Sequence, residues 1–269
     1  MNDFAYTTLS NVKQNNNLAD AGLTASDDSA LQDFIYIASD AINDYTGTWF
    51  TPTIETFDYD VNHVDRYNGL LNLNRDLQTL NAVSIDDTAQ TLSDYRKSPE
   101  NSQPANYVYS AAWSQSTPDA IGITGVWCFH DRYNTAYRLQ GTLISGVTDS
   151  DTVIPVVETG LETGQLLRIN DELMQVVSTA TNAVTVTRGV FGSIAAAHLL
   201  GDTVEYFQPM RTIQQACTRL AAFMWVRRGG FEAYTFQPDG TAVTFPSDLP
   251  SDVKGLLDRL NIGLRISTV

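Results

Sequence analysis

The chain has 269 residues and a formal net charge of -15, with 16 Lys plus Arg against 31 Asp plus Glu. This length can bury a substantial core, and so acidic a chain repels phosphate, which argues against sequence-specific DNA binding. The apolar runs stay short of the roughly 18 residues of a membrane helix, and residues 1–9 lack the pattern of a secretory signal, so we expect a soluble protein without membrane contact.

The first predicted element is an amphipathic helix over residues 27–46, where apolar side chains recur at helical spacing. Ser26 is suited to cap its amino end, and the two aspartates that follow complement the positive end of the helix dipole. Gly47 is placed to end the helix. A shorter helix is expected at residues 8–15, before a run of three asparagines that favours a loop.

Short strands separated by turn residues are predicted after this helix. In the first set, the strands are expected at residues 53–59, 69–73, 82–85, 107–110 and 120–129. Turns are expected at residues 86–87 and 99–101. The second set is expected at residues 152–157, 165–169, 172–178, 183–188 and 203–206, with a tight turn at residues 170–171.

Two helices are predicted near the carboxyl end of the sequence. The first begins at Pro209 and has one apolar face, and Arg227 and Arg228 lie at its negative end before the stop signal of a Gly-Gly pair. A hairpin is expected over residues 232–245. The last helix opens with Pro250, and the chain ends in an extended tail.

Together these elements predict an α+β fold. Helices of the N- and C-terminal regions pack with a β-rich body, and an inserted all-β subdomain interrupts it. The expected domains are residues 1–141 for the first helix and β body, 142–207 for the insertion, 208–262 for the C-terminal helices and hairpin, and 263–269 for the tail.

The three histidines, His63, His130 and His198, are too scattered to predict a metal site, and no two lie four residues apart on a predicted helix. We expect surface or strand-end imidazoles. His130 and Asp131 are adjacent, so on a strand they would point to opposite faces, and a cap for the strand at 120–129 is favoured over an acid/base pair.

The remaining motifs also favour structure over chemistry. Residues 149–151 (Asp-Ser-Asp) lack the glycine and distant glutamate of a calcium loop, so a turn is predicted there. The sequence contains no Gly-x-Ser-x-Gly motif and no phosphate-binding loop. Cys128 and Cys217 lie among apolar residues, which predicts buried thiols, no disulfide and a reducing compartment. We therefore expect no enzyme, and no catalytic, metal or cofactor site.

Several segments resemble head-tail connector (adaptor) proteins of long-tailed bacteriophages. The segment 31–47 (Leu-Gln-Asp-Phe-Ile-Tyr-Ile-Ala-Ser-Asp-Ala-Ile-Asn-Asp-Tyr-Thr-Gly), preceded by an acidic pair, is similar to the first helix of that family. Residues 82–86, 95–96 and 121–130 resemble its β portion, and residues 245–250 precede a last helix as in the family. Residues 187–193 (Thr-Arg-Gly-Val-Phe-Gly-Ser) and 195–198 resemble a small β module of virion proteins.

The resemblance implies a structural protein of the virion neck, between capsid and tail, that is made in the host cytoplasm. It implies an oligomeric, commonly dodecameric ring under the portal protein and above a stopper or tail-completion protein, with DNA passing through the lumen without sequence-specific contacts. Because the family's C-terminal segment engages the portal, the tail is the expected portal-binding site, with residues Leu264, Arg265, Ile266, Ser267, Thr268 and Val269.

Two other functions remain open at the level of the sequence. The β insertion is compatible with a virion decoration or a glycan-binding module. The many acidic pairs are compatible with a carboxylate-based cell-wall hydrolase, since nothing in the sequence selects one pair.

Overall fold

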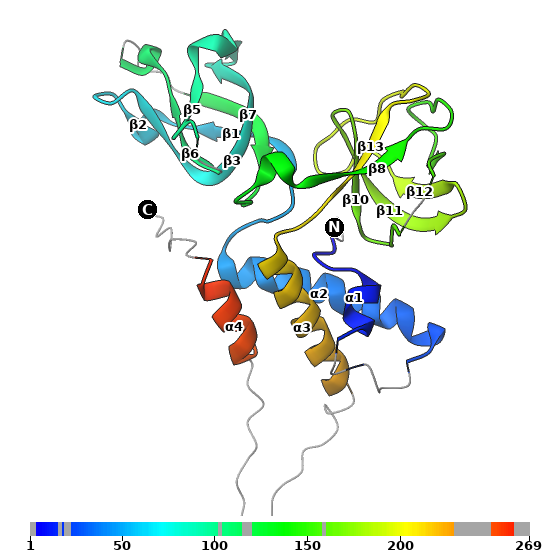
Figure 1. Ribbon diagram of the computed structural model, residues 1–269. Coiled ribbons are helices and arrows are strands. Elements are labelled where there is room, and N and C mark those ends of the chain that lie inside the picture. Colours follow the sequence, from blue (N-terminus) through cyan, green and yellow to red (C-terminus); the bar gives the residue numbers. More distant parts are fainter. Residues whose placement is uncertain are drawn as a thin grey trace, which may run out of the picture.

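The computed structural model describes residues 4–15, 18, 23–101, 104–114, 120–157, 160–228 and 249–260. Figure 1 shows two separate β units above a layer of helices, and the helices from the two ends of the chain lie together in that layer. This confirms the α+β class. The predicted hairpin at 232–245 and the tail at 263–269 lie outside the described residues.

The helical layer contains α1 (Leu9–Lys13), α2 (Asp28–Thr46), α3 (Arg211–Arg227) and α4 (Ser251–Asp258). The apolar side of α2 packs on α3, where Ser39 Oγ lies 3.4 Å from Cys217 Sγ. Both predicted helices of the core are thus confirmed, and the packing of their apolar faces explains why they form.

The ends of α2 test the predicted helix signals. Gly47 ends the helix in the left-handed conformation, with φ 61°, as predicted. The predicted cap at Ser26 is wrong, because Ser26 lies inside a 3-10 turn, Ala25–Asp27, that precedes α2. Thr24 is the cap of this turn. Its backbone N–H and its hydroxyl both donate to the Asp27 carboxylate at 2.9 Å, so the cap lies two residues before the predicted one.

The first β unit is a seven-stranded antiparallel sheet with the order β1-β7-β3-β6-β5, in which β2 and β4 also pair with β3. Its strands are β1 (Thr53–Tyr59), β2 (Val64–Asp65), β3 (Leu70–Ile85), β4 (Thr88–Ala89), β5 (Arg96–Ser98), β6 (Ala105–Tyr109) and β7 (Ile121–Trp127). The two strands predicted at 69–73 and 82–85 are one long strand, β3. Its pairing shifts register three times, which lets a polar middle stay in the strand.

The second β unit contains β8 (Tyr137–Thr142), β9 (Val153–Ile154), β10 (Leu166–Ile169), β11 (Glu172–Ala180), β12 (Ala183–Thr187) and β13 (Thr203–Phe207), in the order β8-β13-β10-β11-β12-β9. A bridge between Leu143 and Val156 joins the two ends of this order, so the sheet closes into a barrel. The barrel begins at Tyr137, earlier than the boundary at residue 142 that the sequence indicates. Asn170, with φ 54°, makes the predicted turn between β10 and β11.

The described residues form three hydrophobic cores. A first-sheet core lies within residues 57–127 and a barrel core within residues 143–206. The third, the helical core, joins the helices to the side of the barrel that faces them, through Leu166, Leu173 and Phe207. Both cysteines are buried and free, as predicted, and burial raises the pKa of Cys217 to about 12. Within the described part of the chain, no helix has the length and apolar content to cross a membrane.

Candidate functional site

The residues predicted to bind the portal, from Leu264 to Val269, lie outside the described residues. Within the described chain, three features bear on function. They are a buried ionic cluster in the barrel, a polar pocket beside it and an exposed apolar tip.

The ionic cluster consists of Glu172, Arg188 and His198. The Glu172 carboxylate accepts hydrogen bonds from Arg188 Nε at 2.6 Å and Nη2 at 2.7 Å, and its Oε2 lies 2.8 Å from His198 Nε2. All three side chains are buried, with 1%, 6% and 2% of their side-chain surface exposed. His198 is therefore not the surface or strand-end imidazole that the sequence predicts.

The cluster fastens two loops to the barrel wall. Arg188 also donates to the carbonyl oxygens of Thr148, Asp151 and Ala196, at 2.9, 2.7 and 2.6 Å. Glu172 also accepts the backbone N–H of Gly189 at 3.2 Å and of Ala196 at 3.0 Å. Because every donor and acceptor here is occupied by the protein itself, the geometry supports a rigid structural clasp.

Burial and hydrogen bonding act in opposite directions on the Glu172 carboxyl. Burial raises its pKa, whereas the hydrogen bonds from Arg188, the Ala196 N–H and His198 lower it. The lowering is the larger effect, so the pKa of Glu172 lies below its ordinary value. Glu172 is thus held ionised at neutral pH. Among the residues described, no three His, Cys, Asp or Glu side chains are grouped so as to hold a metal ion.

The residues that follow Arg188 connect the barrel to the rest of the molecule. Phe191 O accepts the N–H of Ile54 in β1 at 2.8 Å, and the Phe191 ring packs edge-on against Phe4 at 5.8 Å. Gly192 has φ 77°, and a Cβ there would lie 1.8 Å from the Ile54 carbonyl oxygen. Only glycine permits this approach. We call residues 189–193 the docking loop, because they pack on the edge of the first sheet.

His130 and the predicted turn at 149–151 have structural roles. His130 is buried, its Nδ1 accepts the Arg132 N–H at 3.1 Å, and its Nε2 lies 3.3 Å from Gln208 O. Burial lowers the pKa of His130, which favours a neutral ring that ties the two connections between the barrel and the rest of the chain. The turn is confirmed, because the Asp151 carboxylate accepts the Thr148 N–H at 2.7 Å.

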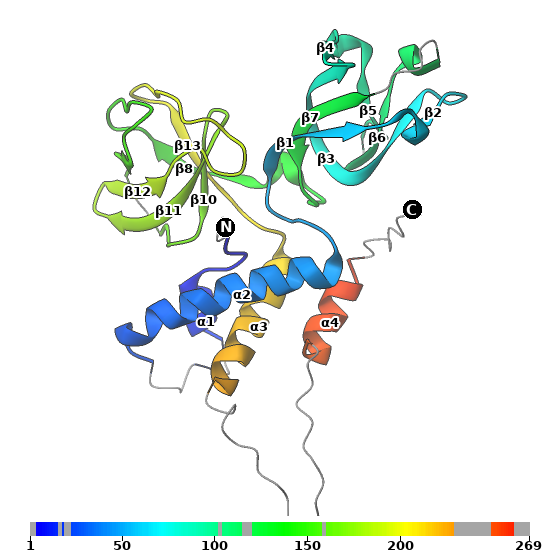
Figure 2. The same ribbon diagram turned by 180° about the vertical axis from the view of Figure 1, so that it is seen from behind.

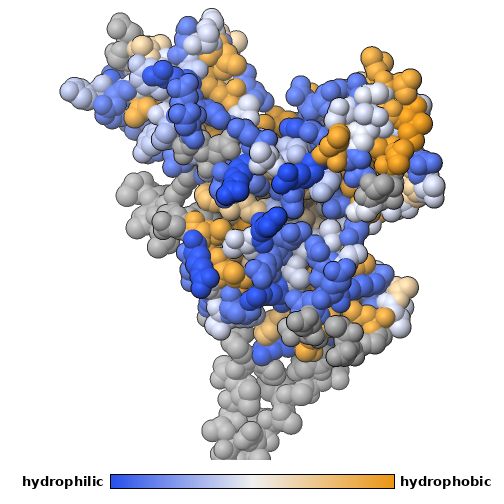
Figure 3. Space-filling model, in the orientation of Figure 1, coloured by the Kyte–Doolittle hydropathy of each residue, from blue (hydrophilic) through white to orange (hydrophobic). Residues whose placement is uncertain are grey.

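The outer end of the barrel exposes large apolar side chains, and we call this surface the apolar tip. Its members Ile144, Leu199 and Leu200 are 46%, 74% and 69% exposed. The two loops that carry them are held together by the bridge between Val147 and His198. Figure 3 shows apolar side chains gathered at this corner of the molecule. Such a patch is typical of a protein-protein contact.

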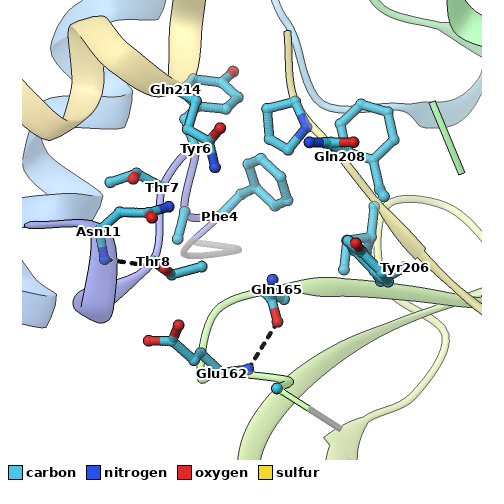
Figure 4. A pocket seen from close by; sticks show the side chains of 15 residues that line it. Phe4, Tyr6, Thr7, Thr8, Asn11, Glu162, Gln165, Tyr206, Gln208 and Gln214 are labelled. Carbon is cyan, nitrogen blue, oxygen red and sulfur yellow. Dashed lines mark hydrogen bonds between the residues drawn. The ribbon is translucent and has the colours of Figure 1, made fainter. Parts of the chain in front are cut away.

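A polar pocket of about 220 Å³ lies where the N-terminal segment, the barrel and the start of α3 meet (Figure 4). Its lining includes amide and hydroxyl groups and the Glu162 carboxylate, whose Oε2 accepts the Ser10 N–H at 2.9 Å. The Tyr6 hydroxyl donates to Asn43 at 2.6 Å, and burial raises its pKa well above the usual value. Glu162 thus links the barrel to the N-terminal segment, and Tyr6 links that segment to α2. The pocket is therefore a polar interface between parts of the fold.

Sequence reasoning did not find the cluster, the docking loop or the tip. Glu172 is separated from Arg188 by 16 residues and from His198 by 26, and they meet only through the β11–β12 hairpin and the bridge between Val147 and His198. The run Thr-Arg-Gly-Val-Phe-Gly-Ser at 187–193 was the available signal. No protein-family model matches the chain, and a search of the curated proteins found no matching relative.

Proposed function

We propose that this chain is a structural head-to-tail adaptor of a phage neck. In this role it forms a ring under the portal, links capsid to tail and lets DNA pass through the lumen. The observation that carries the proposal is the packing of α2 from the start of the chain on α3 and α4 from its end, with the β units to one side (Figures 1 and 2). This element order is the one that the resemblance to head-tail connectors implies.

We further propose that the barrel is an insertion into the adaptor core. Its first and last strands, β8 and β13, pair directly, with Tyr137 opposite Phe207, so the chain enters and leaves at one place. It also has a core of its own. Both properties support insertion, because such a unit interrupts a host domain without separating the host's flanking segments.

The two ends of the molecule suit different neighbours. The barrel carries the apolar tip at its outer end, away from the helices, which supports a contact with the stopper or tail-completion protein on the tail side. The residues from Leu264 to Val269 follow the helical layer in sequence and are proposed to grip the portal by adding an extended strand to it.

Electron microscopy of purified virion necks tests the proposal, with the chain located by an added epitope tag. We expect a ring between portal and tail, and we expect a chain that lacks residues 263–269 to lose binding to the purified portal. A chain in which Gly and Ser replace those residues at equal length controls for loss of length alone. Density on the capsid shell or tail surface instead of the neck would overturn the proposal and favour the alternative, a decoration or glycan-binding protein, which the closed barrel also fits.

A further inference from the structure

The polar pocket between the N-terminal segment, the barrel and α3 contains polar side chains that the fold itself does not use. The amides of Asn11 and Gln214 and the hydroxyl of Tyr206 line it, and none of these three groups has a hydrogen-bond partner among the described residues. Figure 4 shows them on different sides of one space, with Asn11 from α1, Gln214 from α3 and Tyr206 from β13. A cavity on which a few polar groups converge is the usual form of a small-molecule site.

Gln165 and Glu162 each offer the pocket one further atom. Gln165 Oε1 accepts the Glu162 N–H at 2.7 Å, so its Nε2 stays a donor without a partner in the described chain. Glu162 Oε2 accepts the Ser10 N–H at 2.9 Å, so its Oε1 stays an acceptor on the same terms. These two hydrogen bonds hold both side chains in place before a ligand arrives, which lowers the entropic cost of binding one.

The charges around the pocket decide which ligands fit. Of the fifteen described residues that line it, none is Lys, Arg or His, and Glu162 is the one carboxylate. An anion would therefore find no cationic partner, and the net charge of -15 repels it. An ammonium group could pair with Glu162, but it has no acceptor atom for the amide donors and would leave them unpaired, which costs affinity. A neutral ligand that both donates and accepts hydrogen bonds matches the lining.

We propose that this pocket binds one pyranose ring of a neutral carbohydrate. Each sugar hydroxyl is both a donor and an acceptor, so neighbouring hydroxyls can pair with both atoms of the Asn11 and Gln214 amides. Gln165 Nε2 and Glu162 Oε1 serve the remaining hydroxyls. The volume of about 220 Å³ lies below the roughly 300 Å³ at which pockets for drug-sized ligands begin, so the pocket holds a single ring. The site needs α1 and α3 as well as the barrel, which separates it from a glycan site on the barrel alone.

Saturation-transfer NMR on the purified full chain tests the proposal, with glucose, galactose, mannose and N-acetylglucosamine as probes. We expect at least one of these sugars to bind with a Kd on the order of 1 mM, as suits a ligand of this size. Q214A should weaken that binding at least about threefold, and N11A/Q214A should weaken it at least about tenfold, because each change removes an amide that the ligand alone would use. Since neither amide has a partner in the fold, both variants should keep the melting temperature of the natural chain.

Q215A is the matched control, because Gln215 is the exposed neighbour of Gln214 on α3 and lies outside the lining. It should bind the sugar like the natural chain. The inference is overturned if none of the four sugars binds, if N11A/Q214A binds as well as the natural chain, or if methylammonium or inorganic phosphate competes the sugar away at equal concentration. It does not rest on the proposed neck: a sugar-binding chain found outside the neck would keep the inference and overturn that placement.

Discussion

Glu172 is a buried carboxylate whose two oxygens accept five hydrogen bonds, between 2.6 and 3.2 Å long. E172Q removes the charge while Arg188 stays buried, and the loss of one partner of a buried ion pair costs about 3–5 kcal/mol. We expect hydrogen exchange at pH 7 to show that the free energy of opening the barrel falls by this amount. E205Q is the control in the same barrel, because the pair of Glu205 with Arg168 at 2.6 Å is about a third exposed and should contribute about 1 kcal/mol or less.

The same residue makes the effect depend on pH. The pKa of Glu172 is depressed in the folded chain, whereas in the unfolded chain it lies at about 4.3. A depressed folded pKa stabilises the fold above the unfolded value, and the stabilisation is lost as the pH falls through the folded pKa. The difference between E172Q and the natural chain should therefore be largest near pH 7 and shrink below about pH 4. A difference that grows in acid would contradict the assigned charge.

At the scale of elements, two glycines with similar backbone angles have different surroundings. Gly47, with φ 61°, ends α2 in open space, so G47A should cost only the strain of a left-handed residue, about 1–2 kcal/mol. Gly192, with φ 77°, has the Ile54 carbonyl in the way of any Cβ. G192A should therefore cost more than G47A in thermal unfolding, and it should also expose the Ile54 amide to hydrogen exchange. Equal costs, with Ile54 still protected, would show that the docking loop is not held by close approach.

Elements with strong local signals were predictable from the sequence, and their long-range pairing was not. The strand at 53–59 has the predicted bounds, and the helix at 27–46 is correct to within one residue. The sequence predicts two strands in place of β3 because the middle of β3 is polar. Only pairing with both β6 and β7, through register shifts, keeps that middle extended. The ionic cluster could not be predicted for the same reason, since its three members meet only after β11 pairs with β12 and Val147 pairs with His198.

At the scale of the whole molecule, the helical core depends on the barrel, but the barrel core does not depend on the helices. The barrel core is built of residues 143–206 alone, whereas the helical core includes Leu166, Leu173 and Phe207 of the barrel. The barrel can therefore keep its core when the helices open, but the helices lose part of theirs when the barrel opens. The first-sheet core shares no residue with either.

This asymmetry predicts how two equivalent substitutions spread. Leu31 of α2 and Leu167 of β10 are both fully buried, and Leu→Ala at such sites costs about 2–5 kcal/mol. In hydrogen exchange, L31A should speed exchange in the helices and spare β8–β13, whereas L167A should speed exchange in the barrel and in α2 and α3. The first-sheet core should change in neither variant, whereas the amides of Ile54 and Val126, which pack against the helical core, should exchange faster when that core opens. A barrel that opens in L31A as far as in L167A would mean that the molecule unfolds as one unit, and that the barrel depends on its host for stability, against its proposed origin as an insertion.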